Sequence, residues 1–145
     1  MTTSRAVFSA AVLVTATLGS AGPAWADEPP TPDVLDGTYT YSDGISTQQW
    51  TASPCGLACI NIEASPAAGK PGFSGQATNF RGWTLTVEGL PDVVKCSDGS
   101  TAAGGMNFRW DAQLTGYGHT FSTAEACGKP PQPYDTFNFT LTKAS

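Results

Sequence analysis

Glycine and proline recur along this chain so often that a long helix has almost no room to form. The sequence contains 16 glycines and 11 prolines, and inside a helix these residues cost about 1 and 3 kcal/mol relative to alanine. Beyond the apolar run near the N-terminus, no stretch keeps the 3.6-residue period of an amphipathic helix. We therefore expect an all-β fold.

Apolar and polar residues alternate in the short segments between these breaks. Trp83, Leu85 and Val87 occupy every second position of residues 83–88, and residues 137–142 alternate in the same way. A strand sends such residues to one face. Further strands are predicted at residues 37–41, 47–53, 59–63, 73–80, 92–96, 106–111 and 120–124.

About eight or nine short strands with one apolar face indicate an antiparallel sheet, because parallel strands are usually apolar on both faces. A meander closed into a barrel would leave no exposed edge. A two-sheet β-sandwich uses the same alternation and stays open as the alternative.

The N-terminus has the three parts of a secretory signal peptide. Arg5 supplies positive charge, residues 6–18 are apolar, and Ala24-Trp25-Ala26 matches a cleavage site. The apolar run is shorter than the roughly 20 residues that span a bilayer, so no stable membrane anchor is expected. We predict a signal peptide over residues 1–26, a proline-rich acidic leader over 27–36 and one domain over 37–145.

Four cysteines, Cys55, Cys59, Cys96 and Cys127, follow the predicted cleavage site. An even number of cysteines in an exported chain indicates disulfides. Three pairings are possible, and we favour Cys55 with Cys59, across a tight turn, and Cys96 with Cys127, around a hairpin region. Zinc is the competing interpretation, but His119 is the only histidine, and we expect neither a metal nor a cofactor.

The charge balance excludes one class of partner. Arg5 leaves with the signal peptide, so the mature chain carries six basic against twelve acidic residues, a net charge of −6. An acidic surface repels phosphate backbones, and the basic residues do not cluster. Nucleic acid is not an expected partner.

No residue set points to catalysis. The acids Asp43, Glu63, Glu88, Asp98, Asp111 and Glu125 show no spacing that pairs any two of them. His119 lies in a glycine-rich segment that we interpret as a hairpin turn exposed to solvent. The tryptophans Trp50, Trp83 and Trp110 are predicted to fill the core, and they would line a pocket for an apolar guest if the interior is not full.

One run of residues resembles a known group of proteins. It consists of Gly37-Thr38-Tyr39, Trp50, Pro54-Cys55-Gly56, Cys59, Trp83, Cys96-Ser97-Asp98-Gly99-Ser100, Trp110-Asp111-Ala112 and Leu114-Thr115-Gly116. The run resembles small exported proteins of mycobacteria and their relatives, and the extracellular segments of some mycobacterial serine/threonine kinases. The resemblance covers most of the mature domain and implies a shared exported scaffold, without a catalytic assignment.

These observations predict a secreted, non-enzymatic domain that binds a small apolar ligand or a protein partner. A carboxylate-based hydrolase and a cell-surface structural protein are the alternatives.

Overall fold

The computed structural model describes residues 34–144. The predicted signal peptide and residues 27–33 of the predicted leader lie outside the described residues. Leu35, from the end of that leader, is buried in the core. The described chain forms eight strands: β1 (Gly37–Ser42), β2 (Thr47–Gly56), β3 (Cys59–Ala64), β4 (Phe73–Asn79), β5 (Trp83–Lys95), β6 (Thr101–Trp110), β7 (Thr115–Phe121) and β8 (Pro133–Lys143).

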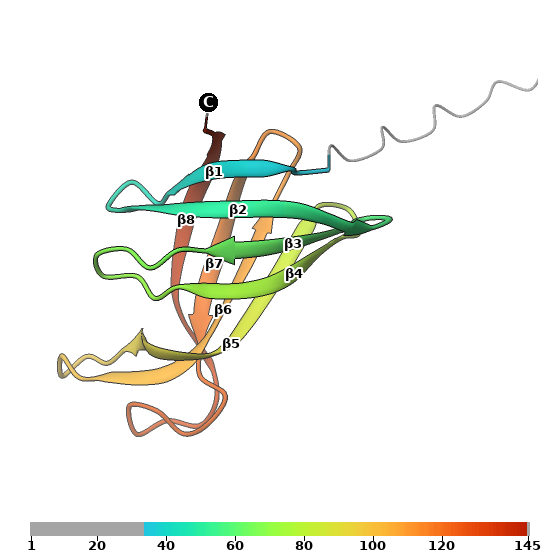
Figure 1. The fold of residues 1–145 in the computed structure, drawn as a ribbon. Helices are drawn as coiled ribbons and strands as arrows, with labels where there is room; N and C mark the ends of the chain where they lie inside the picture. Colours follow the sequence, from blue (N-terminus) through green and yellow to red (C-terminus); the bar gives the residue numbers. More distant parts are fainter. Residues whose placement is uncertain (1–33, 145) are drawn as a thin grey trace, which may run out of the picture. The chain divides into compact units, whose positions relative to one another are not determined.

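The eight strands form one closed antiparallel barrel (Figure 1). Each strand pairs with the next in sequence, and β1 closes the sheet by pairing with β8, with Tyr41 opposite Leu141. The predicted all-β meander is confirmed, as a barrel rather than the alternative sandwich. None of the residues from 34 to 144 belongs to a helix that is long and apolar enough to cross a membrane.

The predicted alternation sets which side chains fill the barrel. Trp83, Leu85 and Val87 are all buried, as are Phe139 and Leu141 of β8. Aromatic rings form much of this core, and the Tyr41 ring stacks on Trp50 and on Phe139 with centroid separations of 5.1 and 5.2 Å. Tightly packed rings of this kind supply a large share of the burial energy of a small domain.

Two predicted strands, 83–88 and 92–96, are in fact one. Strand β5 runs from Trp83 to Lys95 and stays paired with β6 through two register shifts. Gly89 and Asp92 lie at these irregularities with left-handed φ angles of 70° and 56°. Bulges absorb the extra residues without ending the strand.

The prediction of a hairpin turn around His119 was wrong. His119 lies within β7, paired with Asn107 on one side and Thr136 on the other, and it is half-buried. The neighbouring glycines leave space for aromatic rings from β8: a Cβ on Gly118 would lie 2.6 Å from the ring of Phe137. These glycines therefore allow ring packing inside a strand, where the sequence pattern suggested a turn.

The loops of a meander lie alternately at the two ends of the barrel. One end, which we call the mouth, carries four loops: 43–46, 65–72, 96–100 and 122–132. The opposite end carries three turns: 57–58, 80–82 and 111–114. The disulfide Cys96–Cys127 joins two loops of the mouth, and Cys55–Cys59 crosses the β2–β3 turn at the opposite end. Both favoured pairings are confirmed.

Candidate functional site

A cavity of about 390 Å³ lies at the mouth of the barrel. Its inner wall is mainly apolar and comes from distant parts of the sequence: Phe73, Val93, Met106, Phe108 and Phe137. Its volume is within the range of about 300 to 1,000 Å³ typical of small-molecule sites. Barrel mouths are common places for such sites.

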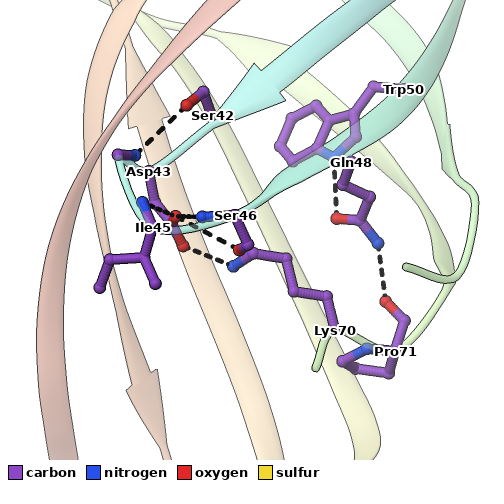
Figure 2. Close-up of polar contacts among 9 residues, drawn as sticks. Ser42, Asp43, Ile45, Ser46, Gln48, Trp50, Lys70 and Pro71 are labelled. Carbon is purple, nitrogen blue, oxygen red and sulfur yellow. Dashed lines mark hydrogen bonds and ion pairs between the residues drawn. The ribbon is translucent and has the colours of Figure 1, made fainter. Parts of the chain in front are cut away.

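One side of the mouth is fastened by an ion pair between two loops (Figure 2). Lys70, from the β3–β4 loop, places its Nζ 2.6 Å from Oδ2 of Asp43, in the β1–β2 loop. The same ammonium lies 5.0 Å from the centre of the Tyr41 ring, within the range of a cation–π contact. The charge of Lys70 is therefore satisfied within the chain.

The carboxylate of Asp43 also organises its own loop. The backbone N–H groups of Ile45 and Ser46 donate to Oδ1 of Asp43 over 3.0 and 2.8 Å. Partial burial by itself would raise the pKa of Asp43, but the hydrogen bond from Lys70 and those from the two backbone groups outweigh it and lower the pKa to about 2. Asp43 is consequently a carboxylate at neutral pH.

Gln48 is a buried polar residue of the cavity wall whose amide is fully used. Its Nε2 donates to the carbonyl oxygen of Pro71 over 2.9 Å, and its Oε1 accepts a hydrogen bond from Trp50 Nε1 at 3.2 Å (Figure 2). The same Nε2 also donates to the carbonyl oxygen of Ser65 over 2.8 Å. These bonds tie β2 to the β3–β4 loop and hold that side of the mouth in place.

Two residues that line the cavity each carry a buried hydroxyl group without a hydrogen-bond partner. These hydroxyls are Oη of Tyr41 on β1 and Oγ1 of Thr120 on β7, from side chains that are 1% and 7% exposed. Burial, and secondarily the charge of Asp43, raise the pKa of the Tyr41 phenol, so this group is uncharged at neutral pH. Native proteins seldom leave buried hydroxyls unpaired, so these two groups are hydrogen-bonding capacity beside the cavity that the described chain does not use.

The chain matches no protein-family model, no curated protein and no solved structure. The cavity, its unpaired hydroxyls and the ion pair at its edge are the features that single out the mouth.

The three tryptophans lie in the core. Trp50, Trp83 and Trp110 are 1%, 2% and 3% exposed, and Trp110 contacts both of the others with centroid separations of 6.2 and 6.3 Å. Trp83 and Trp110 border a smaller cavity of about 270 Å³ that is also lined by Arg81 and Arg109. Trp50 does not line the mouth but supports its wall, because its Nε1 donates to Gln48 and its ring packs against Tyr41, Phe73 and Phe108.

The other candidate residues are dispersed or structural. Oδ1 of Asp98 accepts hydrogen bonds from the N–H and hydroxyl of Ser100, as its turn position predicted, and Oδ1 of Asp111 accepts bonds from the N–H groups of Gln113 and Thr115. Among residues 34–144, no three His, Cys, Asp or Glu side chains gather as metal ligands.

Sequence reasoning missed the residues that define the mouth. A signal existed for Gln48, because alternation places it on the same face as Trp50. Thr120 shares a face with Gly118 in the same way, but the misassigned turn concealed it. Lys70 and Asp43 lie in loops 27 positions apart, and no local pattern relates them.

Proposed function

We propose that this chain is an exported, non-enzymatic binding protein that holds a small, largely apolar molecule in the barrel mouth. The observation that carries the proposal is the cavity of about 390 Å³ with two unpaired hydroxyls in an otherwise apolar wall. Export is supported by the signal-like N-terminus and by the two disulfides, which persist in oxidising compartments.

The polar groups near the cavity favour binding over catalysis. Asp43 is held by Lys70 and by its own loop, and Asp92 accepts a hydrogen bond of 2.6 Å from Thr101. Asp135 is exposed at the edge. A general acid or base needs a pKa near the working pH, whereas the pKa of Asp43 lies far below it.

Titration with an uncharged fluorescent probe tests the proposal. N-phenyl-1-naphthylamine, added to protein produced from the full chain, should bind saturably with one site per barrel. Met106 lines the cavity, and Met106→Trp should weaken this binding at least tenfold by filling the space. Tyr117→Trp is the matched control, because Tyr117 is half-exposed and is not part of the mouth wall.

Equal binding by wild type and Met106→Trp would place the probe elsewhere and contradict the assignment. Absence of saturable binding would favour a protein partner instead. Hydrolysis of cell-wall glycans or esters that is abolished by Asp43→Asn would overturn the non-enzymatic interpretation. Intact mass of the secreted product measures export processing, with Asp27 as the expected first residue.

A further inference from the structure

The charges around the mouth are either paired or exposed to solvent. Five charged residues border the cavity, and two of them, Asp43 and Lys70, neutralise each other across 2.6 Å. The other three, Asp92, Lys95 and Asp135, are exposed. Among the described residues, the buried part of the wall thus offers no unpaired charge to a ligand. A charged group moved there would lose its hydration without gaining a counter-ion, which is unfavourable.

The polar groups that remain for a ligand are neutral. The amide of Gln48 is occupied on both of its atoms. The hydroxyls of Tyr41 and Thr120 are free, and each can both donate and accept a hydrogen bond. Their residues lie on β1 and β7, which are separated by the single strand β8, and both residues line the same cavity.

Aromatic and aliphatic side chains surround these two hydroxyls. Phe73 and Phe108 stack at 5.6 Å, and Phe137 meets Phe108 edge-on at 5.8 Å. Such a wall fits flat rings, whose faces and edges pair favourably with it. The wall has no other unpaired side-chain polar atom among those buried in the described residues, since the third such atom, Nε1 of Trp110, belongs to a side chain outside the mouth wall.

We propose, building on the function proposed above, that the ligand is an uncharged ring compound with a hydroxyl or carbonyl group that hydrogen-bonds to Tyr41 and Thr120. The ring lies against the phenylalanines, and the polar group points to the two hydroxyls. Acids, phosphates and amines of the same size are disfavoured, because the two least exposed charges of the wall, Asp43 and Lys70, already neutralise each other.

Lys70 covers the Tyr41 end of this site. Its ammonium lies over the Tyr41 ring, and Oη of Tyr41 is shielded from solvent. A ligand that reaches this oxygen therefore displaces the lysine side chain, which is flexible and sits in a loop. The Lys70 and Asp43 side chains are only 16% and 12% exposed, so the contacts that the ligand makes must outweigh the loss of this ion pair.

Four probes with one shared ring system test the ligand class. Naphthalene, 2-naphthol, 2-naphthoate and 2-naphthylmethylammonium are titrated calorimetrically at neutral pH into protein produced from the full chain. We expect 2-naphthol to bind about 2- to 10-fold more tightly than naphthalene, the effect of one net hydrogen bond. The carboxylate and the ammonium should bind more weakly than naphthalene.

Variants then locate the hydrogen bonds. Tyr41→Phe and Thr120→Val keep the shape of each side chain and should reduce the preference for 2-naphthol over naphthalene, while naphthalene itself binds as before. Tyr39→Phe is the matched control, because Tyr39 is a buried tyrosine of the same strand that is not part of the mouth wall, and its preference should equal that of wild type. If Tyr41→Phe proves misfolded, Thr120→Val alone provides the measurement.

The outcomes separate the two proposals. Tighter binding of either charged probe, or a 2-naphthol preference unchanged in both variants, overturns the ligand class while the binding function stands. If N-phenyl-1-naphthylamine and all four probes fail to bind, the proposed function falls and the ligand class falls with it.

Discussion

The two disulfides are expected to differ in what they contribute to stability. Cys96 and Cys127 are 31 positions apart, whereas Cys55 and Cys59 are 4 apart. A cross-link stabilises a protein mainly by restricting the unfolded chain, and the effect grows with the length of the loop it closes. The long loop should contribute about 3.5 kcal/mol and the short loop about 2 kcal/mol.

Replacing each pair of cysteines by serine measures this difference. Urea unfolding followed by tryptophan fluorescence gives the free energy of unfolding of wild type and of both double variants. Because a small domain is stable by about 5 to 15 kcal/mol, loss of the Cys96–Cys127 bridge removes a large part of the total. The corresponding decreases in melting temperature are about 15 °C and 8 °C, at roughly 4 °C per kcal/mol.

The position of the bridges provides a control. They lie at opposite ends of the barrel, so removing all four cysteines should cost the sum of the two effects within about 0.5 kcal/mol. Equal losses of stability for the short and the long bridge would contradict the dependence on loop length. Four titratable thiols in the folded protein would refute the disulfides altogether.

Three further predictions concern single residues. Gly118→Ala should lower the free energy of unfolding by about 1 to 3 kcal/mol, because its Cβ would lie 2.5 Å from a backbone oxygen and 2.6 Å from the Phe137 ring. Gly75→Ala should lower it less, because the nearest neighbour of that Cβ is the end of a leucine side chain. Chemical denaturation measures both variants, and equal losses would contradict the packing argument. Asp43 has a pKa lowered to about 2 from 3.8, so its ionised form stabilises the fold fully above about pH 5. That contribution should disappear as the pH falls from about 4 to 2, and the stability difference between wild type and Asp43→Asn should shrink over the same range; a difference independent of pH would refute the role of the carboxylate. Tyr41→Phe should leave stability unchanged or raise it by up to about 1 kcal/mol, because the hydroxyl that it removes has no partner; a thermal melt that shows a clear loss would mean that the hydroxyl is bonded within the folded chain.

Which side chains of a strand enter the core follows from the alternation of apolar and polar residues along the sequence. Alternation along residues 83–87 places Trp83, Leu85 and Val87 on one face, and all three are buried. The turn at Asp98 was also predicted, and Oδ1 of Asp98 accepts the expected hydrogen bond from the N–H of Ser100. These features depend on residues that are near one another in the sequence.

The site at the mouth depends instead on residues brought together by closure of the sheet. Tyr41, Lys70 and Thr120 belong to β1, the β3–β4 loop and β7, and they border one cavity only because β1 pairs with β8. The same holds for Gly118, whose place within a strand is explained by the Phe137 ring on the neighbouring strand.

The sequence by itself thus determined the all-β class and the inward residues, because period-two alternation and glycine and proline breaks act over short stretches of chain. Cysteine spacing favoured the observed disulfide pairing among three possible ones. Tertiary structure alone decided that the sheet closes as a barrel, that β7 runs through its glycines, and that two hydroxyls remain unpaired inside the mouth. Strand closure and cavity shape arise from how side chains that are distant in sequence fill the interior, and the spacing of residues along the chain does not specify that volume.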